Sequence, residues 1–130
     1  MIDEMMKKAW EASTHAYVPY SKFKVGACVL CMDGTFFIGS NVENASYGLT
    51  NCAERSALYS CYSHGYRKKD ILAIGIVNDS ENLITPCGAC RQVLKELVNK
   101  DTKIVLENKK QRKLVTIEEL LPMAFELEGN

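Results

Sequence analysis

Three cysteines and one glutamate form the pattern with the clearest chemical potential in this sequence. Cys52 is followed two residues later by Glu54, and Cys87 and Cys90 form a Cys-x-x-Cys pair further along the chain. Three thiolates can bind a zinc ion and leave its fourth coordination position open for water, as a catalytic zinc site requires. A neighbouring carboxylate can carry protons. The pattern therefore predicts a catalytic zinc site with Glu54 as its proton shuttle.

Both cysteine motifs lie where a loop is expected to give way to a helix. A helix N-terminus carries unpaired N–H groups and about half a positive charge, so it lowers the pKa of a nearby thiol. Gly88 permits the tight turn between Cys87 and Cys90. Arg55 and Arg91 each follow a ligand motif directly. Because three thiolates around one Zn²⁺ leave a net negative charge, we expect one or both arginines to donate hydrogen bonds to the thiolates.

The cysteines also admit less specific interpretations. A lone Cys-x-x-Cys motif can be redox-active or half of a structural zinc site. A structural site would need a fourth protein ligand, and the two histidines, His15 and His64, lie near neither motif. Cys28 and Cys31 stand three apart in an expected strand, so they point to opposite faces and cannot chelate one metal together. They and Cys61 are best interpreted as small buried apolar residues.

Composition limits the classes of function that need to be considered. The 130 residues suit one domain with a real core. The formal net charge is zero, from 16 basic and 16 acidic residues, which argues against strong binding to nucleic acid or to an anionic membrane. We expect residues 1–6 to form neither a signal peptide nor a transit peptide, and no stretch approaches the ~20 apolar residues of a membrane span. We therefore expect a cytoplasmic protein whose cysteines are thiols or metal ligands.

Hydrophobic periodicity predicts helices that alternate with strands. Helices are expected at 1–17, 52–62 and 87–99, with a final short helix opened by a capping box at 116–119. Strands are expected at 23–31, 36–42, 71–77, 103–107 and 114–115, and an Asp-Gly hairpin signal separates the first two. The apolar run 71–77 suits a strand that is covered on both faces. The expected fold is one domain over residues 1–130, a three-layer α/β/α arrangement with a mixed sheet of about five strands.

The sequence resembles the small, homotetrameric, zinc-dependent cytidine deaminases from about Tyr20 to Phe125. The shared segments are residues 20–27, 41–47, 51–55, 86–92 and 120–125. The zinc motifs occur across the wider deaminase superfamily, whereas the segments around Phe23 and Asn41 are more specific to enzymes that act on free nucleosides. After Phe125 the family often continues with Gly-Pro and an acidic tail, and this sequence instead has residues 126–130, Glu-Leu-Glu-Gly-Asn.

The resemblance implies a role for each matching residue. In the metal site, Cys52, Cys87 and Cys90 would ligate zinc and Glu54 would carry protons. The residues implied at the nucleoside are Phe23 against the pyrimidine ring, Asn41 and Glu43 on the ribose hydroxyl, Val42 and Ala53 beside them, and Ala45, Tyr47 and Phe125 from a neighbouring subunit of a homotetramer.

The residues themselves support the sugar contact but leave an alternative open. Asn41 and Glu43 stand two apart at an expected strand end, so they share a face, and an amide with a carboxylate can donate to and accept from hydroxyl groups. The alternative is a polar strand end that faces solvent. Likewise, Phe23 and Phe125 could be core residues, and Tyr47 could be an exposed loop aromatic.

The implied reaction is the hydrolytic deamination of cytidine and 2'-deoxycytidine to uridine and 2'-deoxyuridine, with release of ammonia, in pyrimidine salvage. Three alternatives are weighed against it. They are a deaminase of RNA or DNA, which the zero net charge disfavours; a deaminase of a modified cytosine nucleoside; and a structural zinc-binding module without turnover. The basic cluster at 109–113 is most simply interpreted as the exposed side chains of a turn.

Overall fold

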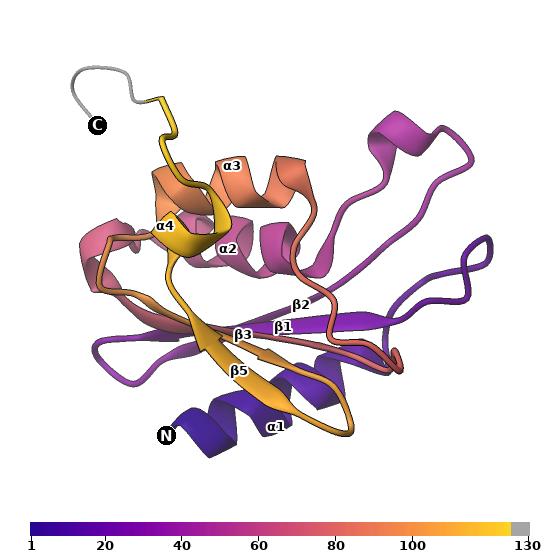
Figure 1. Cartoon of the computed structure of the whole chain (residues 1–130), viewed down its shortest axis with the longest axis horizontal. Coiled ribbons are helices and arrows are strands. Elements are labelled where there is room, and N and C mark those ends of the chain that lie inside the picture. The colour runs from indigo at the N-terminus through magenta and orange to yellow at the C-terminus, as the bar shows by residue number, and fades with distance from the viewer. Residues whose placement is uncertain (126–130) are drawn as a thin grey trace.

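Five strands form one mixed sheet in the computed structural model, which describes residues 1–125, and helices cover both of its faces (Figure 1). The strands are β1 (Val25–Cys31), β2 (Phe36–Ser40), β3 (Ile71–Asn78), β4 (Lys103–Glu107) and β5 (Arg112–Val115). The helices are α1 (Ile2–Ser13), α2 (Ala53–Ser63), α3 (Gly88–Leu97) and α4 (Ile117–Leu120), with short 3₁₀ turns η1 (Tyr47–Leu49) and η2 (Lys68–Asp70). Residues 126–130, which include the atypical tail, lie outside the described residues.

The strand order is β2-β1-β3-β4-β5. β3 and β4 are parallel, whereas the other neighbouring pairs are antiparallel. Parallel neighbours require a crossover connection, and here α3 provides it. The crossover places the start of α3 near the end of β3, on the same face of the sheet as α2.

The two sides of the sheet bury separate apolar clusters. On one side, Met5, Met6 and Ala9 of α1 pack on Cys28 and neighbouring strand residues. On the other side, α2, α3 and α4 pack together over a larger cluster that contains Cys31. The three-layer α/β/α prediction and the mixed five-stranded sheet are therefore confirmed. Cys28 and Cys31 lie on opposite faces, as their spacing in a strand predicted.

Several predicted boundaries moved by two residues or more: β2 ends at Ser40 rather than 42, α3 ends at Leu97 rather than 99, and β5 begins at Arg112 rather than 114. The largest shift, at the first helix, follows from tertiary hydrogen bonds. The first helix ends at Ser13 rather than near Tyr17, because Tyr17 pairs through its backbone with Asn41 and Glu43 at the end of β2. The first strand begins at Val25 rather than Phe23. Periodicity alone does not register such pairings, since they depend on residues more than twenty positions away. No helix of the described residues has the length and apolar character needed to cross a membrane.

Gly39 lets the first turns of α2 rest directly on β2. A Cβ atom at this position would lie 2.5 Å from the amide nitrogen of Ala57 and 2.6 Å from the carbonyl oxygen of Ala53. Both atoms belong to the helix backbone, which cannot move aside without lifting the helix. The absence of a side chain at Gly39 therefore fixes the height at which α2 begins above the sheet.

We expect Gly39→Ala to lower the free energy of unfolding by about 1–3 kcal/mol or more, because the added methyl group overpacks this contact. Urea denaturation would measure the change. Gly48→Ala is the matched control, since a Cβ there meets nothing within 4 Å. An equal loss in both variants, or no loss in Gly39→Ala, would contradict this account of how α2 is seated.

Candidate metal centre

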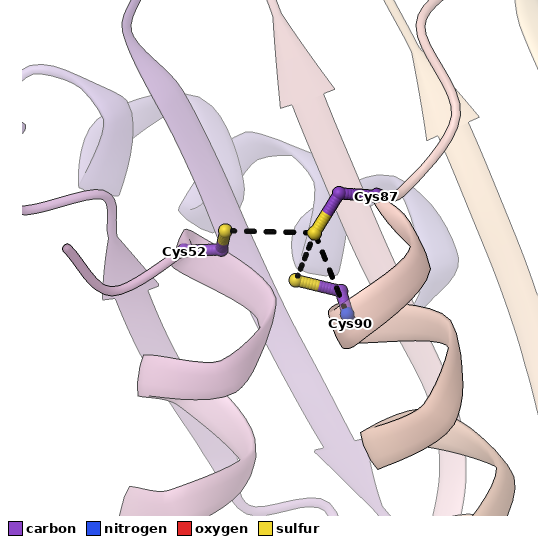
Figure 2. Close-up of side chains that lie close together, drawn as sticks. All are labelled: Cys52, Cys87 and Cys90. Carbon is purple, nitrogen blue, oxygen red and sulfur yellow. Dashed lines mark hydrogen bonds between the residues drawn. The ribbon is translucent and has the colours of Figure 1, made fainter. Parts of the chain in front are cut away.

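Three thiols meet where α2 and α3 begin (Figure 2). Cys52 is the residue immediately before α2, Cys87 is the residue immediately before α3, and Cys90 lies in the first turn of α3. Their sulfur atoms all lie within 4.8 Å of one another. The Sγ of Cys87 is 4.0 Å from that of Cys52 and 3.3 Å from that of Cys90. Soft thiolate ligands at such spacing favour zinc among the common metal ions.

The positions of these cysteines at helix starts follow from the local backbone. Cys52 and Cys87 both have extended backbone angles, as residues that precede a helix do. The Sγ of Cys87 accepts a hydrogen bond of 3.5 Å from the amide of Cys90, so the thiol caps its own helix. The partial positive charge of two helix N-termini therefore faces the sulfur cluster.

Arg55 supplies a full positive charge to the same cluster. Its Nη2 donates to the Sγ of Cys52 at 3.3 Å, and its Nε is buried without a hydrogen-bond acceptor among residues 1–125. A hydrogen bond from Cys90 together with the Arg55 guanidinium holds the pKa of the Cys52 thiol below its usual range. The same hydrogen bond and burial raise the pKa of Cys90. A bound cation would stabilise the thiolate forms of both Cys52 and Cys90. The donor set therefore fits a divalent metal ion.

Arg91 has different partners. Its guanidinium donates to the carbonyls of Pro86 (2.8 Å) and Leu120 (2.7 Å) and to the hydroxyl of Thr85 (2.6 Å). The expectation of a sulfur contact therefore holds for Arg55 and not for Arg91. Sequence distance from a ligand did not distinguish them, because the direction of each side chain depends on what the helix packs against.

Glu54 is buried beside the cysteines, with 4% of its surface exposed. Burial raises the pKa of its carboxyl group to about 7. Together with Cys52 and Cys87 it lines a cavity of about 230 Å³. Phe23, Asn41 and Ala53, which the resemblance implies as nucleoside contacts, line the same cavity. The carboxyl group is therefore placed where a molecule in this cavity could exchange a proton with it.

Six further residues of the cavity wall were not anticipated as site residues, namely Val25, Ile76, Asn78, Ile84, Thr85 and Pro86. Asn78 is the last residue of β3 and only 2% exposed. A polar residue at the end of an apolar run could have identified it from the sequence as a site residue. Thr85 and Pro86 directly precede Cys87, which is one of the predicted zinc ligands. Their adjacency to a metal ligand could have identified them.

Asn41 and Glu43 both hold the segment that carries Phe23. Asn41 donates to the carbonyl of Phe23 (2.8 Å) and accepts from the amide of Val25 (3.0 Å). The carboxylate of Glu43 accepts from the amides of Tyr20 and Ser21 and from the Ser21 hydroxyl, which lowers the pKa of Glu43.

The remaining expected contacts lie away from the cysteine cavity. Glu43 and Tyr47 line a separate hollow of about 400 Å³. Val42 pairs through its backbone with Asn51, and Ala45 is exposed. Tyr47 is 81% exposed, and Phe125, in the segment after α4, is 67% exposed. Neither Val42, Ala45, Tyr47 nor Phe125 lines the cavity beside the cysteines of its own chain.

Comparison with known proteins finds relatives over nearly the whole length. A family model for the cytidine and deoxycytidylate deaminase zinc-binding region matches residues 1–106. Cytidine deaminase from Halalkalibacterium halodurans is 51% identical over 125 residues, which cover 95% of this chain and 93% of that protein. Cytidine deaminase from Sporosarcina psychrophila is 43% identical over 128 residues, which cover 98% of this chain and 93% of that protein.

Solved structures give the same result. The crystal structure of cytidine deaminase from Burkholderia pseudomallei superposes with a TM-score of 0.92 at 46% identity, covering 96% of this chain and 99% of that one. The structure from Mycobacterium tuberculosis superposes with a TM-score of 0.81 at 39% identity, covering 97% and 98%. The sheet and the helix starts that bring the thiols together are thus part of a shared fold.

We expect Cys52→Ser to lose the zinc that the native chain binds at about one ion per chain, because two sulfur ligands hold zinc much less tightly than three. Metal analysis after dialysis against a weak chelator would measure the loss. Cys28→Ala is the control, because Cys28 is buried on the opposite face of the sheet. This variant should keep its zinc. Full zinc content in Cys52→Ser would contradict the assignment.

Proposed function

Because the chain belongs to the cytidine deaminase family, we propose that it catalyses the hydrolytic deamination of cytidine and 2'-deoxycytidine to uridine and 2'-deoxyuridine, with release of ammonia. The observation that supports this most directly is the buried carboxyl group of Glu54 beside three thiols on one cavity. Such a donor set can hold a metal and still leave room for water and a substrate atom. The place we propose for this reaction in metabolism is pyrimidine salvage.

Cys52, Cys87 and Cys90 would hold the zinc ion. When bound, zinc supplies a water molecule of much lowered pKa, which becomes the attacking group. Glu54 takes a proton from that water and delivers it to N3 of the cytosine ring, which makes C4 electrophilic. The water oxygen adds at C4. Glu54 then takes the remaining proton of that added hydroxyl group and delivers it to the amino group, so that the C–N bond breaks, ammonia leaves and the C4 carbonyl forms. A carboxyl group with a pKa of about 7 can both accept and donate a proton near neutral pH.

The base and the sugar would be held by the segment around Phe23. Phe23 lines the cavity and would pack against the pyrimidine ring, and Ala53 lies beside it. A primary amide has two donor hydrogens and two acceptor lone pairs. Asn41 uses one of each on the backbone of Phe23 and Val25, so one donor and one acceptor stay available for a ribose hydroxyl. Glu43 would complete the sugar contact through the lone pairs that its three internal hydrogen bonds leave.

The alternatives predict different observations. A structural zinc module needs a fourth protein ligand, yet the cluster within residues 1–125 consists of three cysteines. His15 is exposed, and the Nδ1 of His64 lies 2.7 Å from the carbonyl of Ser60. A nucleic-acid deaminase would need a basic surface, whereas Lys109 and Lys110 are paired with Asp79 and Glu81. Competition assays with modified cytosine nucleosides would test the remaining alternative.

We further propose that the chain works in the cytoplasm as a homotetramer with shared active sites. All six cysteines are free, which suits a reducing compartment. Ala45, Tyr47 and Phe125 are exposed and lie away from the cavity of their own chain, so they are free to approach the nucleoside in a neighbouring subunit. Exposed aromatic side chains such as those of Tyr47 and Phe125 are what an interface between subunits would bury.

We expect Glu54→Gln to keep its zinc and its fold while kcat falls by at least about 10²–10⁴-fold, because the amide cannot carry a proton between water and the ring. Ultraviolet monitoring of cytidine would measure turnover. Glu11→Gln, an exposed residue of α1, is the control and should retain full activity. Near-normal turnover in Glu54→Gln would remove the proton shuttle from the mechanism.

Light scattering should give a mass near four times the 14.6 kDa of one chain. Joint replacement of Tyr47 and Phe125 by alanine should lower that mass or raise KM, because both side chains would be buried between subunits. A monomeric mass for the fully active native chain would rule out shared active sites.

A further inference from the structure

Arg91 joins three segments of the chain through one guanidinium. Its Nε donates to the carbonyl of Pro86, its Nη2 to the hydroxyl of Thr85, and its Nη1 to the carbonyl of Leu120, all at 2.6–2.8 Å. Within residues 1–125, the hydrogen bonds that the structure gives to Thr85 and Pro86 come from this side chain. Arg91 itself lies on α3, one residue after Cys90.

Thr85 and Pro86 form part of the cavity wall, at the inner end of the segment between β3 and α3. The outer end of this segment is held separately. Asn108 is 3% exposed and donates through Nδ2 to the carbonyls of Ser80 (3.0 Å) and Glu81 (3.4 Å). The position of the inner end therefore depends on Arg91 rather than on the contacts made at the outer end.

The third partner of Arg91 is a firm anchor. Leu120 is the last residue of α4 and is buried, as is Ile117 at its start. A capping box fixes the first turn, because the Thr116 hydroxyl accepts from the amide of Glu119 while the Glu119 carboxylate accepts from the amide of Thr116. α4 packs beside α3 over the same face of the sheet (Figure 1).

We propose that Arg91 is a positioning residue for the reaction, which ties the Thr85–Pro86 wall of the cavity to the end of α4. The inference rests on the proposed function, since it takes this cavity as the substrate site. Through Arg91, α4 supports the shape of the cavity although it does not line it. The planar guanidinium suits this task because its donors point in fixed directions toward three acceptors, which a lysine ammonium group cannot match.

The test compares Arg91→Gln and Arg91→Lys with the native zinc-loaded protein, using cytidine as the probe. We expect kcat/KM to fall by about 10- to 100-fold in Arg91→Gln, mainly through KM, because a displaced wall misplaces the substrate without removing a reacting group. Arg91→Lys should recover only part of this loss. Zinc content should stay at the native level in both variants.

Hydrogen exchange of the backbone amides in residues 82–87 gives a readout that does not depend on activity. Faster exchange there in Arg91→Gln is expected, with native exchange in residues 80 and 81, whose carbonyl groups accept hydrogen bonds from Asn108. Failure of the native chain to deaminate cytidine would overturn the proposed function, while the exchange result would still decide whether Arg91 holds the wall.

Arg67→Gln is the matched control, because Arg67 also donates to two backbone carbonyls, those of Tyr62 and Tyr66, away from the cavity. The KM of the Arg67→Gln variant should equal that of the native protein, even if the melting temperature of the variant is lower. Thr85 offers a second pair of variants should Arg91→Gln fail to fold. Thr85→Ser keeps the hydroxyl that Arg91 binds, whereas Thr85→Val keeps the shape and loses the contact, so KM should rise more in Thr85→Val than in Thr85→Ser.

Native KM and native exchange at 82–87 in Arg91→Gln would overturn the proposal. Loss of zinc with unchanged exchange at 82–87 would also overturn it, because Arg91 would then act on the metal site rather than on the wall. Weakening α4 by Thr116→Ala should produce a smaller rise in KM than Arg91→Gln. An unchanged KM in that variant would show that α4 has no part in holding the wall.

Discussion

The convergence of two helix N-termini at one edge of the helical layer is the constraint on which the site depends. The seat of α2 on Gly39 and the crossover that carries α3 from β3 to β4 bring Cys52 and Cys87 together across 35 residues of chain. Neither helix start would attract a metal alone, because each contributes too few thiols. The tight packing that fixes both helices is thus also what gathers the ligands.

Charge balance sets the next requirement. Three thiolates and a divalent cation leave a net negative charge in a partly buried place, and desolvation makes such a charge unfavourable unless positive groups face it. Arg55 and the two helix N-termini supply that compensation. Glu54 lies in the same environment, and burial raises the pKa of its carboxyl group above the value of an exposed glutamate. One local environment therefore favours both metal binding and a carboxyl group able to donate a proton.

The parts of this arrangement that the sequence predicted are those with local causes. Side-chain chemistry and spacing identified Cys52, Cys87, Cys90 and Glu54, and periodicity identified each strand of the sheet within a few residues. The partners of Arg91 could not be read in this way, because Leu120 lies 29 positions away and contributes a backbone carbonyl that carries no residue-type signal. The same holds for the carboxylate of Glu43, which binds backbone amides at positions 20 and 21.

These backbone contacts have a common physical logic. Irregular segments near a site expose amides and carbonyls that no ladder satisfies, and each needs a partner if the segment is to hold one conformation. Asn41 and Glu43 meet this need on the Phe23 side of the cavity, and Arg91 meets it at Thr85 and Pro86. Polar residues in and around this cavity thus act largely by holding the backbone in place. Replacing one of them removes a support for the cavity wall even where it leaves every ligand and reacting group intact.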